Sequence, residues 1–165
     1  MQSSAGDSSK KQKIVAAIQQ SNAQMLAQLL QGFDLETPLT MSGSTTLMVC
    51  CAETTNKDVL RAILKSRPNL LAQDTFGRTA LHYACKNGSV DFISELCQAD
   101  QIKNGGMNAQ THGGDTPLMY ACQSGSLYAV AECLNQNFNP FFENALRMTA
   151  RDYAAQFPSN YAASI

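Results

Sequence analysis

Six cysteines and two histidines are the residues of this 165-residue chain that could build a metal, redox or nucleophilic centre. Zinc sites usually take their cysteines from CxxC pairs, because the ligands must converge on a tetrahedron. No CxxC pair occurs, and Cys50 and Cys51 are adjacent, which suits neither zinc nor a simple disulfide bridge. Neither His82 nor His112 has a spacing to serine and aspartate that predicts a hydrolase triad.

Motifs for phosphate binding and for paired-carboxylate catalysis are also missing from the sequence. The glycine pairs Gly105-Gly106 and Gly113-Gly114 are interpreted as loop and hairpin glycines rather than as phosphate-binding loops. The sequence therefore predicts a protein that is not an enzyme and that needs no cofactor and no metal.

The composition narrows the class of partner. Apolar residues make up 44% of the chain and charged residues 15%, a balance typical of a folded soluble protein. A net charge of −1 favours neither nucleic acid nor an anionic membrane as partner. The apolar runs are far shorter than the roughly 20 residues that cross a bilayer, so we expect no membrane insertion.

The polar, serine-rich start of the chain has no apolar stretch of the kind a signal peptide needs. We interpret residues 1–11 as a flexible N-terminal tail. Without a secretory signal, reduced thiols are the better expectation, and they place the protein in the cytoplasm or the nucleus.

An internal repeat organises the rest of the chain. Residues 77–88 (GRTALHYACKNG) reappear as residues 114–125 (GDTPLMYACQSG), with looser copies at 43–51 and 148–155. The threonines of the four copies, at 45, 79, 116 and 149, are 34, 37 and 33 residues apart. The apolar spacing alone extends upstream to residue 12, so the predicted repeat domain covers 12–165, with units of about 12–40, 41–73, 74–106, 107–140 and 141–165.

The departures from a constant period have simple interpretations. One inserted residue within 51–59 explains the spacing of 34, and a longer loop at 99–106 explains the spacing of 37. Insertions of this kind in solenoids often lie on the binding side.

The sequence of each unit predicts two short helices. Thr79 opens the first helix, where its hydroxyl can cap free N–H groups, and Gly88 ends it. Apolar pairs four residues apart, such as 92–93 and 96–97, predict a second helix with one buried side. All six cysteines fall at core positions of these helices, so we interpret them as small packing residues. A single pair cannot bury its apolar side, whereas stacked copies can.

In these features the chain resembles the ankyrin-repeat family. The resemblance rests on the 33-residue period, on Thr-Ala-Leu-His or Thr-Pro-Leu before a helix, and on a glycine between two helices, over about residues 12–157. It implies an all-α ankyrin-repeat solenoid of stacked helix-turn-helix units with β-hairpin loops. It also implies that His82 bonds within and between turns. Asn108 matches the hairpin asparagine that asparaginyl hydroxylases modify in some animal ankyrin proteins, although a structural role in the hairpin is the alternative.

The resemblance implies a function as well. Ankyrin proteins bind other proteins through a concave surface made of the hairpin tips and the exposed side of the first helices. This predicts a protein–protein interaction module, acting as adaptor or scaffold, with another protein as partner and no small-molecule ligand. The partner-binding residues carried onto this chain are Gln73, Thr75, Phe76, Arg78, Lys86, Asn87, Gln110, His112, Asp115, Gln123, Leu146 and Met148, with Met41, Ser42, Ser44, Ala52 and Glu53 beside them.

Four of these residues suit an interface anchor, because aromatic, arginine and methionine side chains are enriched at interface cores. They are Phe76, Arg78, Leu146 and Met148. The alternative is that Phe76 folds over its own hairpin and that Arg78 is merely solvated.

The C-terminal unit departs from the family pattern. Arg147 stands where the hairpin glycine belongs, and Pro158 leaves only residues 160–165 for a second helix. We therefore expect a thinly capped end, covered by the tail or by a partner. Phe141 and Phe142 are predicted to fill the core beneath the last hairpin.

Two other functions stay open. The chain could be a fixed accessory subunit of a larger assembly. It could also resemble the small ankyrin-type inhibitors of enzymes such as kinases, but their second repeat typically has a shortened first helix, whereas residues 47–53 look complete here.

Overall fold

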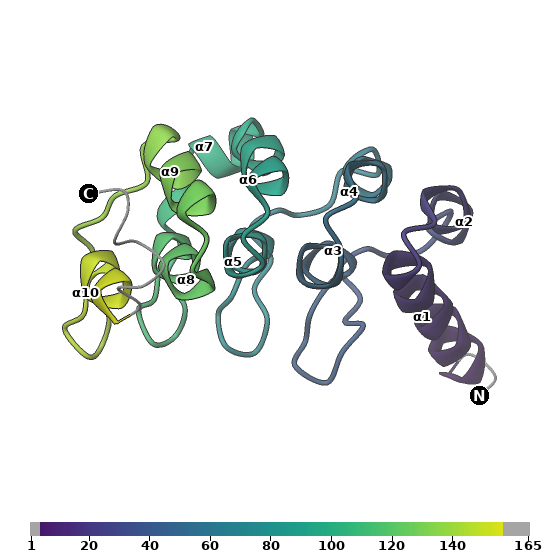
Figure 1. The fold of residues 1–165 in the computed structure, drawn as a ribbon. Helices are drawn as coiled ribbons and strands as arrows, with labels where there is room; N and C mark the ends of the chain where they lie inside the picture. The colour runs from purple at the N-terminus through teal and green to yellow at the C-terminus, as the bar shows by residue number, and fades with distance from the viewer. Residues whose placement is uncertain (1–3, 157–165) are drawn as a thin grey trace.

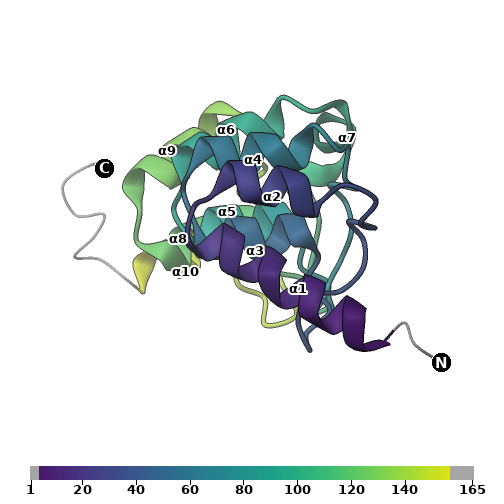
Figure 2. The same cartoon turned by 90° about the vertical axis from the view of Figure 1, so that its right-hand side faces the viewer.

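The computed structural model describes residues 4–156 and shows a row of stacked helix pairs (Figure 1). The pairs and the last helix are α1 (Ser4–Gln19) with α2 (Ala23–Leu29), α3 (Thr46–Glu53) with α4 (Lys57–Leu64), α5 (Ala80–Lys86) with α6 (Val90–Cys97), α8 (Pro117–Ser124) with α9 (Leu127–Asn135), and α10 (Ala150–Ala155). First and second helices form two layers, which Figure 2 shows from the N-terminal end. No strand occurs within 4–156, so the predicted all-α solenoid of stacked units is confirmed.

A capping hydrogen bond at the N-terminus of the first helix recurs from unit to unit. In four units the threonine before the helix donates its backbone N–H to the side chain three residues later, as in a capping box. The pairs are Thr45 with Met48 Sδ (3.5 Å), Thr79 with His82 Nδ1 (3.1 Å), Thr116 with Met119 Sδ (3.4 Å) and Thr149 with Asp152 Oδ2 (2.7 Å). A hydroxyl cap is present at Thr116 and Thr149, whose Oγ1 atoms accept the N–H groups of Met119 and Asp152, both at 3.4 Å. At Thr79, where the cap was predicted, no N–H is capped by the hydroxyl, which instead lies 3.0 Å from Nδ1 of His82.

The core lies between the two layers and contains all six cysteines, which are buried and form no disulfide within the described residues. Burial raises the pKa of Cys50, Cys97 and Cys122 to about 12. The Sγ atoms of Cys85 and Cys133 are 3.7 Å apart, well beyond the roughly 2.05 Å of a disulfide bond. The predicted position of the cysteines in the core is therefore confirmed.

The N-terminal segment differs from the prediction. Residues 4–11 were predicted as a flexible tail, but α1 begins at Ser4 and includes them. Lys10 Nζ donates to the carbonyl of Gln31 at 3.2 Å and lies 5.6 Å from the ring centre of Phe33. Since these contacts come from a loop about twenty residues further on, the polar local composition could not reveal them.

The insertion at 99–106 also differs from a simple loop. It contains a short helix, α7 (Asp100–Lys103), followed by the 3-10 turn η1 (Gly106–Asn108). Ile102 is buried, and a Cβ at Gly106 would lie 2.7 Å from Leu71, so the insertion packs closely. Figure 1 shows α7 in the layer of second helices, away from the loops that hang below the first helices. The insertion therefore thickens the second-helix layer and does not extend the predicted binding side.

The prediction for the two phenylalanines before the last hairpin was wrong. Phe141 is 83% exposed and Phe142 is 36% exposed, while Phe138 fills the core instead. The chain turns outward after Phe138, because the side chain of Asn139 accepts the backbone N–H of Phe141 at 2.9 Å. The predicted short helix at 160–165, with Pro158 before it, lies outside the described residues.

Candidate functional site

Each loop between units is closed by one polar side chain. This side chain belongs to the residue five positions before the threonine that opens the first helix. This side chain accepts the backbone N–H four residues later, which folds the loop into a hairpin-like turn. The four acceptors are Thr40 Oγ1 for Ser44 (3.0 Å), Asp74 Oδ1 for Arg78 (2.9 Å), Thr111 Oγ1 for Asp115 (3.1 Å) and Asn144 Oδ1 for Met148 (3.0 Å). This position was not predicted from the sequence, although a hydrogen-bonding residue recurs there in all four copies.

Neighbouring hairpins are bonded to one another through their backbones. Three bonds join the four hairpins in a row, namely Thr75 N–H to Ser42 O (3.0 Å), His112 N–H to Phe76 O (3.0 Å) and Ala145 N–H to Gly113 O (2.9 Å). Because each turn is closed internally and tied to the next, the tips form a preorganised row rather than independent loops.

A row of tyrosines runs along the exposed side of the first helices. Tyr83, Tyr120 and Tyr153 each lie four residues after the helix-opening threonine, on α5, α8 and α10, and each is half-buried. Tyrosine combines a large apolar ring with a polar tip, which is why it is enriched in protein interfaces. These tyrosines were not predicted as partner-binding residues, although their common position in the repeat was a signal for them.

Asp74 is the centre of a polar network at the third hairpin. Its fully buried side chain accepts from Arg78 Nε and from the hydroxyl of Tyr83, both at 2.7 Å. Burial by itself raises the pKa of Asp74, but hydrogen bonds from Arg78, Tyr83 and Phe76 outweigh it and lower the pKa below its usual value. Asp74 therefore stays ionised and fixes the position of Arg78.

Arg78 is clamped between two rings as well as bonded to Asp74. Its guanidinium carbon lies 4.6 Å from the ring centre of Phe76 and 4.9 Å from that of Tyr83. Cation–π contacts of this kind restrict the side chain further. Phe76 thus packs partly on Arg78, yet it keeps 57% of its surface exposed.

A second network ties Asp115 into the last hairpin. Asp115 Oδ1 accepts from Asn144 Nδ2 at 2.7 Å and from the hydroxyl of Tyr153 at 3.0 Å. His82 Nε2 lies 3.2 Å from the carbonyl of the same Asp115, so it links the third unit to the fourth. His82 therefore bonds within and between turns, as the family resemblance implied.

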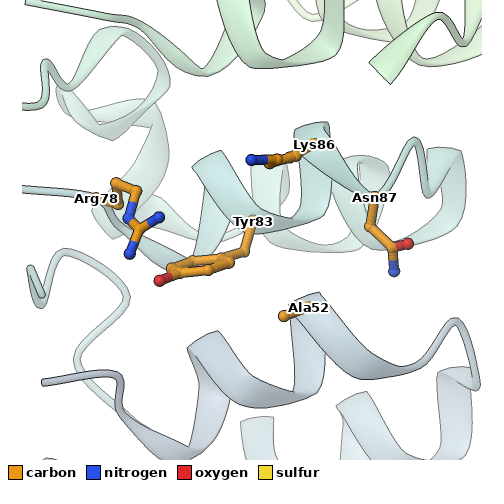
Figure 3. A pocket seen from close by; sticks show the side chains of 5 residues that line it. All are labelled: Ala52, Arg78, Tyr83, Lys86 and Asn87. Atoms are coloured by element: carbon orange, nitrogen blue, oxygen red, sulfur yellow. The ribbon is translucent and has the colours of Figure 1, made fainter. Parts of the chain in front are cut away.

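The first-helix side has a shallow hollow of about 280 Å³ between α3 and α5. It is lined by Ala52, Arg78, Tyr83, Lys86 and Asn87. Figure 3 shows Tyr83 and Asn87 directed from α5 towards α3, where Ala52 faces them, and the Lys86 side chain extended along α5 towards the end where Arg78 lies. Three of the twelve predicted partner-binding residues, Arg78, Lys86 and Asn87, therefore meet in one place, together with Ala52, which was predicted beside them.

The other predicted residues are distributed along the same side of the molecule. Exposed on or beside the hairpins are Gln73, Thr75, Phe76, Gln110, His112 and Leu146. Gln123 on α8 is partly exposed. Asp115 and Met148 are partly buried, and Asp115 is engaged in the network described above. Asn108 lies in η1 rather than in a hairpin, and its Oδ1 accepts the backbone N–H of Asn139 at 2.9 Å.

Comparison with known families gives two matches. The model described as "Ankyrin repeats (3 copies)" matches residues 13–104, and the model described as "Ankyrin repeat" matches residues 113–145. The chain belongs to the ankyrin-repeat family. Ankyrin repeats are generally protein–protein interaction modules. None of the curated proteins matches the chain.

Two further observations concern metal binding and membrane insertion. Within residues 4–156, no three histidine, cysteine, aspartate or glutamate side chains gather closely enough to hold a metal ion. None of the helices in the same part of the chain is long and apolar enough to span a bilayer.

Proposed function

We propose that this ankyrin-repeat protein is a non-enzymatic adaptor that binds a partner protein through its hairpin face. The hairpin face is defined here as the tips of the hairpins at 40–44, 74–78, 111–115 and 144–148 together with the exposed sides of α3, α5, α8 and α10. A non-enzymatic role agrees with the general use of ankyrin repeats and with a site whose acids are engaged in structural hydrogen bonds.

The observation that carries the proposal is the exposure of large apolar side chains on tips that the fold holds rigidly. Met41 is fully exposed, and Phe76 and Leu146 are 57% and 74% exposed, each on a different hairpin. Apolar side chains on preorganised loops bind a partner with little further loss of conformational entropy. Hydrogen-bonding side chains surround them on the same face, as in the polar rim of an interface.

A fixed accessory subunit is the second candidate, and it has its own support. Tyr128 and Leu134 on α9 and Phe141 in the following loop are exposed by 79%, 47% and 83%. These residues lie outside the hairpin face, so a second contact surface would suit a chain built into a larger assembly. The kinase-inhibitor alternative gains no support, because α3 has eight residues, as many as α8.

Affinity capture from native extract with three proteins tests the proposal. The hairpin-face variant is Phe76→Ser with Leu146→Ser, because both side chains are exposed and neither donates a side-chain hydrogen bond. Arg78 is left intact, since its removal would leave the buried carboxylate of Asp74 unpaired. The matched control is Tyr128→Ser with Leu134→Ser on α9.

The proposal predicts that the wild type and the α9 control capture the same partner and that the hairpin-face variant loses it. Loss of the partner only in the α9 control would instead support the fixed-subunit candidate. Circular dichroism of all three proteins checks that each remains folded.

A further inference from the structure

The hollow between α3 and α5 combines two cationic side chains with a wall suited to an aliphatic chain. Arg78 and Lys86 are the cations, while Ala52 and the ring of Tyr83 supply apolar surface. A volume of about 280 Å³ far exceeds the roughly 30 Å³ share of one water molecule, so the hollow has room for a side chain.

Arg78 is fixed in a way that leaves part of its guanidinium unused. Its Nε donates to Asp74, and the rings of Phe76 and Tyr83 flank it. Within residues 4–156 no group accepts from its Nη atoms. The donors of a rigidly held guanidinium match the two oxygens of a carboxylate, because arginine binds this group bidentately.

Lys86 supplies the charge that the network does not neutralise. Asp74 already offsets Arg78, whereas Lys86 forms no ion pair within the described part of the chain and lies 5.8 Å from the ring centre of Tyr120. Arg78, Lys86 and the Asp74 carboxylate paired with Arg78 together carry a net charge of about +1.

We propose, as a deepening of the adaptor function and resting on it, that this hollow receives the carboxylate of a glutamate or aspartate side chain from an acidic segment of the partner protein. The carboxylate lies between the Nη atoms of Arg78 and the ammonium group of Lys86, and its stem packs on Tyr83 and Ala52. A charge of −1 balances the hollow, whereas a phosphorylated residue, with about −1.5 to −2, exceeds it.

Titration of the isotope-labelled full chain with short synthetic peptides, followed by NMR, tests the inference. The probes are a repeated Gly-Ser-Glu peptide, its Gly-Ser-Gln analogue of the same shape, and a phosphoserine peptide of the same length. The side-chain Nε–H of Arg78 is a direct reporter, because its bond to Asp74 protects it from exchange with solvent.

We expect the glutamate peptide to shift the signals of Arg78 and of α5, and the glutamine peptide to leave them unchanged. Lys86→Gln, an exposed change that leaves the core intact, should weaken binding of the glutamate peptide by about fivefold, the scale of one exposed ion pair. Lys103→Gln on α7 removes the same charge away from the hollow and should have no effect.

Equal shifts with the glutamine peptide, no shift with either peptide, or unchanged affinity in Lys86→Gln would each overturn the inference. Stronger binding of the phosphoserine peptide would replace the carboxylate by a phosphate as the recognised group. The two proposals remain separable, because Lys86→Gln can also be used in the capture experiment. Undiminished capture of the partner by Lys86→Gln over a titration of bait, with loss in the Phe76→Ser/Leu146→Ser variant, refutes the acidic contact and leaves the adaptor function standing.

Discussion

His82 shows at the scale of a single residue how the hairpin face is held in place. Its Nδ1 accepts the backbone N–H of Thr79, so Nε2 carries the proton and donates to the carbonyl of Asp115. The ring also meets Tyr120 edge-on, with centroids 5.3 Å apart. Burial lowers the pKa of His82 to about 4, and nearby Asp115 only partly offsets this. Protonation at Nδ1 therefore breaks the bond from the Thr79 N–H at the start of α5, while Nε2–H still donates to Asp115.

We predict that stability falls between pH 6.5 and pH 4 because of His82. The unfolded chain takes up a proton near its ordinary pKa of about 6.5, whereas the folded chain resists until about pH 4, so acid favours unfolding. Between pH 7 and pH 5 the free energy of unfolding should drop by about 2 kcal/mol. Urea denaturation at both pH values measures the drop.

Two variants assign the effect to the right residue. His82→Gln should lose most of this pH dependence, although it lowers stability at pH 7. His112→Gln, at an exposed hairpin position, should keep it. An unchanged pH dependence in His82→Gln would contradict the role given to this histidine.

At the scale of the element, the hairpin depends on one residue with a left-handed backbone. Gly43, Gly77 and Gly114 have φ of 78°, 78° and 83°, and Arg147 occupies the same position with φ of 61°. Glycine adopts this conformation freely, whereas a residue with a Cβ is strained by roughly 1–2 kcal/mol. The last hairpin is therefore strained where the other three are not.

Substitution at this position should change the free energy of unfolding in opposite directions in the third and the last hairpin. Arg147→Gly should raise the free energy of unfolding by about 1 kcal/mol, because it relieves the strain and removes only an exposed pair with Glu143. Gly77→Ala should lower it by more than about 2 kcal/mol, because the added Cβ would lie 2.8 Å from the backbone nitrogen of His112. Urea denaturation of both variants checks this, and a destabilised Arg147→Gly would contradict the strain.

At the scale of the whole molecule, the repeat made the stack of helices predictable from the sequence. The threonine, the core leucine and the small residues recur at fixed spacing, so the positions of His82 and of the cysteines followed once the period was known. The residues at the hairpin tips were likewise found by their place in the repeat. The period thus predicted both the fold and the side of the molecule on which Arg78, Lys86 and Asn87 meet.

Contacts between residues distant in sequence were the part that the repeat could not supply. The pairing of Lys10 with Gln31 extends α1 into a segment whose composition resembles a tail. The turn at Asn139 directs Phe141 outward, although an apolar pair normally predicts burial. The engagement of Arg78 by Asp74 also depends on the folded hairpin, and it changes Arg78 from a solvated side chain into a fixed one.

The central claim, that the hairpin face binds the partner, is tested most directly by site-specific photo-crosslinking in native extract. A photoreactive phenylalanine analogue replaces Gln123 on α8 in one protein and Tyr128 on α9 in another; both positions are accessible, and they lie in different layers. The account predicts a crosslinked partner at position 123 and none at position 128. A partner crosslinked at position 128 and absent at position 123 would contradict it and point to the layer of second helices.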